Sequence, residues 1–170
     1  MTLTRYALLL TAVAVLGACS TSADRFGTGT TDAAAGIGTS GLGDPSDPTS
    51  LAYFQQTVGD RVLFVVDQST LTPAGQSTVA QQAAFLTSNP EYTAIIEGHA
   101  DERGTREYNL ALGARRASAV QDYLVTQGVA PNRLQTVTYG KERPLEVCSD
   151  EACYSQNRRA VTVLAAGLGS

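Results

Sequence analysis

The sequence predicts an α/β domain (an α+β sandwich) in which two main helices cover a mixed sheet, in the order βαβαββ. Strand-like and helix-like segments alternate along residues 53–166. Each strand–helix–strand unit requires two parallel strands joined by a right-handed crossover, whereas the fourth strand follows a loop and can run antiparallel. Hydrophobic residues make up 43% of the 170 residues, which is enough for one packed core.

Four segments have the composition of β-strands. The first, 61–67, is a continuous run of β-branched and aromatic residues, which predicts a strand covered on both faces. The other three are 92–100, 134–139 and 158–165. The last of these alternates valine with threonine, which indicates one buried and one exposed face.

Two segments have the periodicity and the end signals of helices. The first, 73–87, begins with Thr72 as N-cap and Pro73 in the first turn, and Pro90 stops it. The second, 106–126, carries apolar residues at spacings of three and four. These residues are Leu110, Ala114, Ala117, Val120 and Leu124, and their spacing predicts an amphipathic helix facing the core.

The first 18 residues have the pattern of a secretory signal peptide. Arg5 precedes a short apolar run, 6–15, which is too short for a permanent transmembrane helix. The following Leu-Gly-Ala-Cys, ending at Cys19, resembles the bacterial lipobox, whose cysteine is lipidated after residues 1–18 are removed. Because Ser20 and not Asp follows the cysteine, the resemblance implies sorting to the outer membrane. The alternative is an ordinary secretory signal with a chance cysteine.

Residues 19–52 differ in composition from the rest of the chain. They are dominated by Gly, Ser, Thr, Ala and Asp and lack any helical or strand period, so they predict a flexible tether between the lipidated Cys19 and the domain. The alternative is a partly ordered extension that packs on the domain. The predicted domain covers 53–166, and 167–170 form a short tail.

The two remaining cysteines, Cys148 and Cys153, both fall in the predicted loop 140–157. A secreted lipoprotein faces an oxidising compartment, so we expect a local disulfide, which contributes roughly 2 kcal/mol for so short a closed loop. A metal pair or a redox pair is the alternative, although the spacing suits neither. With one histidine and three cysteines, the sequence has few ligands for a structural metal site, and we expect no metal and no cofactor.

The chemistry is concentrated between Gly98 and Val120. Asp101 follows the second strand, where ligand groups often gather in α/β folds. Asn109 and Arg116 are seven residues apart and therefore share a helix face. A carboxylate facing an amide and a guanidinium suits a zwitterion, such as an amino-acid head group. An internal salt bridge between Asp101 and Arg116 explains the same pattern equally well.

The motifs Gly98-His99-Ala100-Asp101, Glu107-Tyr108-Asn109, Arg115-Arg116-Ala117 and Asn157-Arg158-Arg159 together resemble the OmpA C-terminal-like family, most closely its branch of peptidoglycan-associated lipoproteins. The resemblance spans about residues 62–163 and implies noncovalent binding of the peptidoglycan stem peptide through meso-diaminopimelate. It implies that Asp101 binds the ligand ammonium, Arg116 clamps the carboxylate and Asn109 supports them. Arg103 and Leu112 match groove-lining positions, and the loop from Asp67 to Leu71 matches one that supplies backbone groups.

The sequence departs from that family at the end of the first strand. The family's Phe-Asp-Phe-Asp is Phe64-Val65-Val66-Asp67 here, so one of its two aspartates is missing. Arg158 and Arg159 match the family's Asn-Arg-Arg segment, and for them we favour a structural role over ligand contact.

The same resemblance implies partners. It implies an outer-membrane lipoprotein that links the membrane to the cell wall and docks periplasmic Tol proteins (TolB-like) in envelope integrity and cell division. A module that acts mainly by docking proteins is the alternative. The net charge of −4 argues against nucleic-acid binding. An enzyme is not expected, because His99 is the only imidazole and no nucleophile is arranged around it.

Overall fold

The computed structural model describes residues 42–166. The predicted signal peptide, the lipidated Cys19, residues 20–41 of the tether and the tail 167–170 lie outside the described residues. The packed part of the chain begins before the expected boundary at 53. Ser50 is buried and accepts a hydrogen bond from the Tyr53 amide at 3.0 Å, and Ala52 is buried. Ser50 and Ala52 are thus packed, whereas residues 43–49 are exposed.

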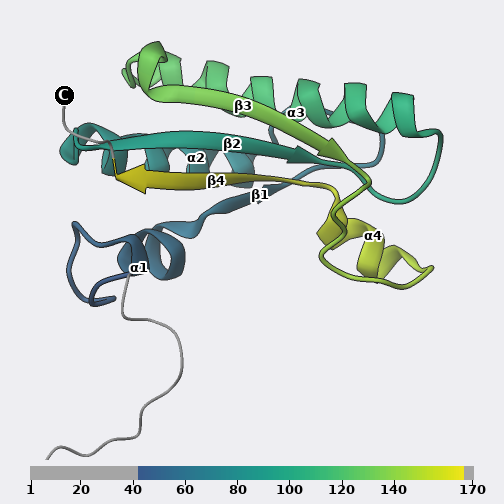
Figure 1. Ribbon diagram of the computed structural model, residues 1–170, viewed down its shortest axis with the longest axis horizontal. Coiled ribbons are helices and arrows are strands. Elements are labelled where there is room, and N and C mark those ends of the chain that lie inside the picture. The colour runs from purple at the N-terminus through teal and green to yellow at the C-terminus, as the bar shows by residue number, and fades with distance from the viewer. Residues whose placement is uncertain (1–41, 167–170) are drawn as a thin grey trace, which may run out of the picture. The chain divides into compact units, whose positions relative to one another are not determined.

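The elements follow one another as the sequence predicts, with short additions (Figure 1). They are α1 (Leu51–Tyr53), the π-helix η1 (Phe54–Gly59), β1 (Arg61–Leu63), α2 (Pro73–Ser88), β2 (Tyr92–His99), α3 (Arg106–Thr126), the 3-10 helix η2 (Pro131–Arg133), β3 (Leu134–Gly140), α4 (Glu151–Asn157) and β4 (Arg159–Ala166). The predicted N-cap of α2 is confirmed, because the Thr72 hydroxyl accepts from the Gly75 amide at 3.1 Å. None of the described helices combines the length and the apolar character needed to cross a bilayer.

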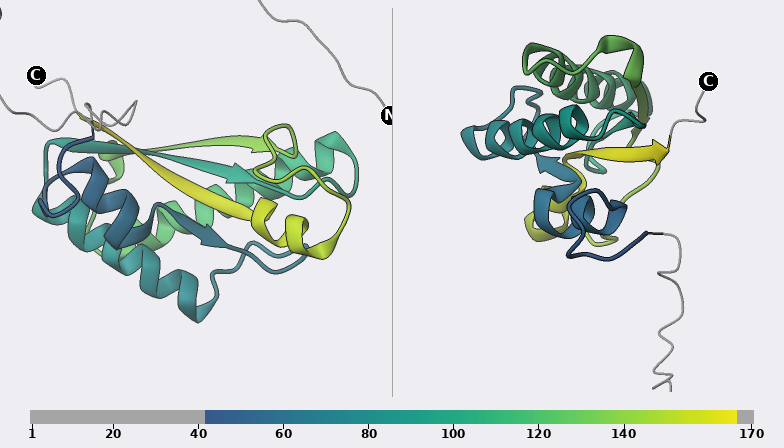
Figure 2. Two further views of the ribbon diagram at one scale, coloured as in Figure 1. Left: turned by 90° about the horizontal axis from the view of Figure 1, so that it is seen from below. Right: turned by 90° about the vertical axis from the view of Figure 1, so that its left-hand side faces the viewer.

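The sheet is mixed, as predicted, and has the order β1-β4-β2-β3. β2 and β3 are parallel, and β4 lies between β1 and β2, antiparallel to both. Helices α2 and α3 pack side by side on one face of this sheet (Figure 2). The core lies between these two layers and includes Val79, Leu86, Ile96, Val120 and Leu124.

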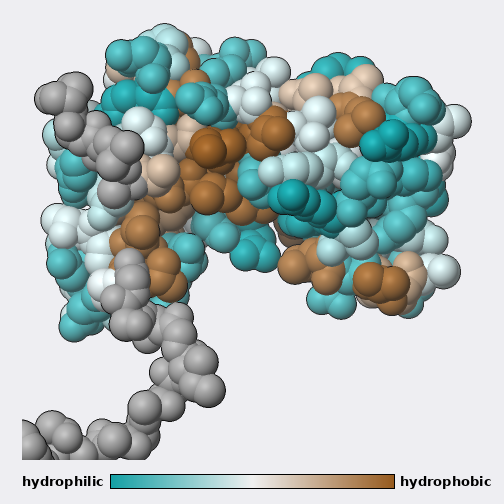
Figure 3. Space-filling model, in the orientation of Figure 1, coloured by the Kyte–Doolittle hydropathy of each residue, from teal (hydrophilic) through white to brown (hydrophobic). Residues whose placement is uncertain are grey.

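The first strand is not covered on both faces, so that expectation was wrong. β1 has only three residues, and Leu63 on β1 and Val163 on β4 are each 40% exposed. They belong to the open face of the sheet, where a hydrophobic patch is visible (Figure 3). The reason is that both long helices lie on the opposite face. After Leu63 the backbone leaves the sheet for a turn, in which the Gln68 amide donates to the Val65 carbonyl at 3.1 Å.

The predicted loop 140–157 contains a helix that the sequence analysis missed. Asp150 is the N-cap of α4, and its carboxylate accepts from the Cys153 amide at 3.1 Å. Cys148 and Cys153 form the predicted disulfide, with their Cα atoms 5.9 Å apart. The disulfide thus ties the first turn of α4 to the loop before it, and α4 leads directly into β4.

Candidate functional site

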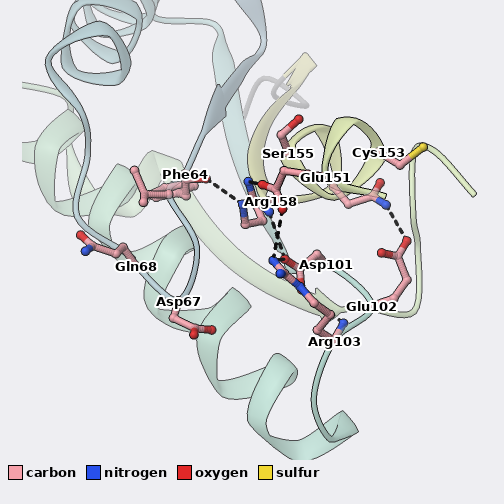
Figure 4. Close-up of polar contacts among 12 residues, drawn as sticks. Phe64, Asp67, Gln68, Asp101, Glu102, Arg103, Glu151, Cys153, Ser155 and Arg158 are labelled. Atoms are coloured by element: carbon pink, nitrogen blue, oxygen red, sulfur yellow. Dashed lines mark hydrogen bonds and ion pairs between the residues drawn. The ribbon is translucent and has the colours of Figure 1, made fainter. Parts of the chain in front are cut away.

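An open pocket of about 560 Å³ lies where the chain leaves β1 and β2 and enters α3. Figure 4 shows Asp101 and Arg103 close together after β2, with Asp67 on the neighbouring loop. The lining residues are Val66, Asp67, Asp101, Arg103, Gly104, Thr105 and Tyr108. Three of the predicted site residues, Asp67, Asp101 and Arg103, therefore meet in one pocket, which contains charges of both signs.

Asp101 is held by two arginines. Its Oδ2 accepts from Arg103 Nη2 at 2.6 Å and from Arg158 Nη1 at 3.2 Å, and its Oδ1 accepts from the Arg103 amide at 3.2 Å. Burial alone would raise the pKa of the Asp101 carboxyl, but the hydrogen bonds from Arg103 and Arg158 outweigh it and hold this pKa below its usual value. The carboxylate is thus charged at neutral pH.

Glu151 on α4 completes a ring of four alternating charges with Asp101, Arg103 and Arg158, which we call the Asp101 charge ring (Figure 4). Arg158 Nη2 donates to Glu151 Oε1, and Arg103 Nη2 lies 3.7 Å from Glu151 Oε2. Two acids and two arginines make the ring neutral. Its inner members, Asp101 and Arg158, have side chains only 10% and 6% exposed, whereas those of Arg103 and Glu151 are 46% and 60% exposed.

Arg116 lies beneath the pocket and is fully buried, with 0% exposure. It donates to three backbone carbonyls, from Nε to Gln68 at 2.8 Å, from Nη1 to His99 at 2.8 Å and from Nη2 to Val65 at 3.2 Å. Burial lowers its pKa to about 10, and the nearby Asp101 partly opposes this shift. Arg116 is therefore a cation at neutral pH that joins α3 to the loop after β1 and to the end of β2.

Within the described residues, no salt bridge joins Asp101 to Arg116. This bridge is the alternative explanation that the sequence allows for the charge pattern. The structure instead gives Asp101 the partners Arg103 and Arg158, and gives Arg116 carbonyl partners.

The other predicted site residues support the pocket from below. Asn109 is buried, and its Nδ2 donates to the Arg103 carbonyl at 2.7 Å, which fixes the turn that presents Arg103. Leu71 and Leu112 are buried and do not line the pocket. Leu71 belongs to the hydrophobic core beneath the loop that contains Asp67.

Asp67 has a backbone conformation that favours glycine, with φ at 55°. Its exposed carboxylate accepts from the Tyr108 hydroxyl at 3.3 Å, and no salt bridge involves it among residues 42–166. Of the two carboxylates in the pocket, Asp67 is thus the one without an arginine partner. Val65 stands where the family motif has its first aspartate, and its carbonyl accepts from Arg116.

His99 belongs to the Gly-His-x-Asp motif but does not line the pocket. It is 2% exposed, packs against Tyr139 with ring centroids 5.5 Å apart, and has no hydrogen-bond partner at either ring nitrogen. Burial first, and then the charges of Arg159 and Arg143, lower its pKa to about 4. The imidazole is therefore neutral at pH 7, and its 3.7 Å approach to Glu97 is not an ion pair there.

The sequence pattern did not indicate Glu151 or Tyr108 as site residues, and it favoured a structural role for Arg158. The antiparallel pairing explains why Arg158 reaches the site: Gly98 on β2 is paired with Ala160 on β4, so the residues just before β4 lie beside those just after β2. The Asn-Arg-Arg segment before the last strand was the available signal. It becomes informative only when β4 is placed next to β2.

The arrangement is suited to binding a small ligand that has both an ammonium and a carboxylate group. A second hollow, of about 320 Å³, lies between the N-terminal turn and α2. Its lining has no charged side chain and consists of Pro48, Tyr53, Val58, Gln81, Ala84, Phe85, Ser88 and Asn89. The pocket at Asp101 is therefore the stronger candidate for recognition of a charged ligand.

Comparison with known proteins agrees with this architecture. The model of the OmpA family matches residues 63–158. A peptidoglycan-associated lipoprotein of Mesorhizobium japonicum is 48% identical over 168 residues, which cover 99% of this chain and 96% of that protein. One from Rhizobium meliloti is 56% identical over 137 residues, covering 81% of this chain and 76% of that protein.

A solved structure shows the same fold. The crystal structure of the peptidoglycan-associated lipoprotein from Burkholderia pseudomallei superposes with a TM-score of 0.64 at 40% identity, covering 72% of this chain and 97% of that chain. Sequence and fold thus agree over the segment that contains the pocket. The chain belongs to the OmpA family, in its group of peptidoglycan-associated lipoproteins.

Proposed function

We propose that this protein binds peptidoglycan noncovalently, through the meso-diaminopimelate residue of the stem peptide, in the pocket beside Asp101. The observation that carries the proposal is the presence of the Asp67 and Asp101 carboxylates and the Arg103 guanidinium in one open pocket. The free centre of diaminopimelate carries one ammonium and one carboxylate. Carboxylates attract the first, and guanidinium groups recognise the second by paired hydrogen bonds. Membership of the OmpA family supports the same ligand.

In this proposal the ligand ammonium binds Asp101, with Asp67 as a second acceptor across the pocket. The ligand carboxylate binds Arg103, which lies 2.6 Å from Asp101 and is the most accessible guanidinium of the pocket. Arg116 acts from below. It is buried and does not line the pocket, so its three hydrogen bonds to carbonyls hold the backbone around the pocket, and its positive charge adds to the attraction for the ligand carboxylate. Asn109, Leu71 and Leu112 support the surrounding backbone.

The binding site is then one end of a mechanical link. Lipidation of Cys19 anchors the other end in the outer membrane, and several acyl chains make a stable anchor where one does not. Residues between Cys19 and the domain span the distance to the cell wall. Such a link contributes to envelope integrity and to constriction during cell division, with the domain facing the periplasm and no catalytic step.

A separate observation supports a second function, the docking of periplasmic Tol proteins. Val66 lines the pocket, and Val65 beside it is 51% exposed. Exposed aliphatic side chains next to a charged site suit a protein partner. A domain that only docks proteins would leave the charges of the pocket without a ligand, so we place this function second.

A pull-down with purified peptidoglycan sacculi tests the proposal. Asp101→Asn and Asp67→Asn each remove one carboxylate of the pocket, and both are expected to lower the bound fraction at least several-fold. Asp67→Asn leaves every salt bridge of the described residues in place, so it separates ligand binding from folding. Asp122→Asn is the matched control, because Asp122 is exposed on α3 and outside the pocket.

The proposal fails if both pocket variants bind sacculi as the wild type does. Release of soluble muropeptides by the wild type would instead indicate an enzyme. Retention of Tol-protein binding with no binding to sacculi would favour the docking function.

A further inference from the structure

The Asp101 charge ring places a carboxylate from outside the pocket next to both arginines that flank Asp101. Glu151 is the only ring member on α4, and it does not line the pocket. Its Oε1 accepts from Arg158 Nη2, and its Oε2 lies 3.7 Å from Arg103 Nη2. A residue in this position influences the ligand through the two arginines, without touching the ligand itself.

The position of Glu151 is fixed by its helix. The Asp150 cap and the Cys148–Cys153 disulfide hold the first turn of α4. At the other end of α4, the buried Asn157 accepts from the Leu145 amide at 2.7 Å and donates to Glu102 at 2.6 Å. The Glu151 carboxylate is thus held beside Arg103 and Arg158 although its side chain is 60% exposed.

We propose that Glu151 determines the charge selectivity of the site, because it balances Arg103 and Arg158 and keeps the Asp101 charge ring neutral. This inference rests on the proposed function. A neutral ring accepts a zwitterionic ligand centre and also tolerates a cationic one, such as a centre whose carboxylate is amidated. Without Glu151, the ring has one net positive charge, which opposes the attraction of Asp101 and Asp67 for an ammonium that no carboxylate accompanies.

The two ligand forms therefore respond differently to the loss of Glu151. For the zwitterion, the added positive charge weakens the contact of the ammonium and strengthens that of the carboxylate, so the two effects largely cancel. For the carboxamide only the repulsion remains. Because Glu151 is exposed, solvent screens the effect, and we expect a selectivity change of about three- to tenfold.

The experiment is a calorimetric or NMR titration of the full chain with two probes. One is a stem tetrapeptide containing meso-diaminopimelate with a free ammonium and a free carboxylate, and the other is the same peptide with that carboxylate converted to a carboxamide. Glu151→Gln is expected to weaken binding of the carboxamide peptide about three- to tenfold more than binding of the zwitterionic peptide. A purely structural loosening of α4 would weaken both equally and leave their ratio unchanged.

Two further variants complete the test. Glu146→Gln makes the same change of net charge in the loop before α4. Glu146 is exposed and forms hydrogen bonds only through its backbone, so the ratio of the two affinities should stay at its wild-type value. Glu151→Asp keeps the charge and should return the ratio toward that value. The inference is overturned if Glu151→Gln leaves the ratio of the two affinities unchanged, or if Glu151→Asp does not bring that ratio back toward its wild-type value. Failure of the wild type to bind the zwitterionic peptide overturns the proposed function itself.

Discussion

Gly98 on β2 and Gly113 on α3 meet backbone to backbone. A β-carbon at Gly98 would lie 1.9 Å from the carbonyl oxygen of Gly113, and one at Gly113 would lie 2.8 Å from the carbonyl oxygen of Gly98. This approach places α3 directly against the end of β2, where Arg116 Nη1 reaches the His99 carbonyl at 2.8 Å. The glycine of the Gly-His-x-Asp motif thus positions the site by allowing close packing.

Gly113→Ala tests this packing, because helix propensity and tertiary contact predict opposite signs. Alanine in a helix interior is normally favoured over glycine by about 1 kcal/mol. Here the new methyl group would also meet the Thr138 hydroxyl at 2.4 Å, and overpacking of this kind costs about 1–3 kcal/mol. We expect net destabilisation in denaturant unfolding. Ser118→Ala on the exposed side of α3 should change stability by less than about 0.5 kcal/mol, and a stabilised Gly113→Ala would contradict the packing argument.

Arg116→Lys should lower the free energy of unfolding by about 2–4 kcal/mol, because a lysine cannot donate to three separated carbonyls and leaves buried acceptors unpaired. Urea unfolding measures the change. The exposed neighbour Arg115 provides the matched control, since Arg115→Lys keeps the charge at a position without such contacts and should be nearly neutral. Equal stability of the two variants would show that the carbonyl contacts contribute little.

The pKa of Asp101 should rise when Arg103 is replaced. In the wild type this pKa is lowered, so the ionised Asp101 stabilises the fold above the unfolded pKa of about 4, and this contribution is lost as the pH falls through the folded pKa. Arg103→Gln removes the side-chain hydrogen bond and the charge of Arg103, which oppose the effect of burial, and it moves the loss to higher pH. A carbon NMR titration of the Asp101 carboxyl measures the shift. Arg106→Gln, which breaks the 3.1 Å pair with Glu142, should leave this titration unchanged.

The free energy of unfolding should also decrease as the pH is lowered, because of His99. The folded pKa is about 4, below the unfolded value of about 6.5, so the unfolded chain binds the proton first as the pH is lowered. The resulting loss begins near pH 6.5, is complete below about pH 4 and amounts to about 3 kcal/mol. Unfolding free energies measured at pH 5–7 should be nearly flat in His99→Phe, whereas a wild-type slope in that variant would assign the effect to other groups.

Local sequence determined the helices whose ends and extent depend on interactions between residues close together in the chain. Thr72 and Thr105 cap α2 and α3 as hydroxyls at helix starts do, accepting from the amides of Gly75 and Tyr108. The extent of α3 followed from its apolar period, since that face must meet the core. The missed helix α4 shows the limit of this approach, because seven residues give too short a period to recognise and its stability comes from tertiary contacts and the disulfide.

Tertiary structure alone decided the partners of the charges in the site. The sequence placed Asp101 and Arg116 in the same region, but Asp101 pairs with Arg158, which is 57 residues away. That pairing depends on β4 inserting between β1 and β2, a choice set by sheet register and core packing over the whole domain. The residue types therefore indicated a site for a zwitterion. The strand order decided that the Asp101 carboxylate of this site lies within a neutral ring closed by Glu151.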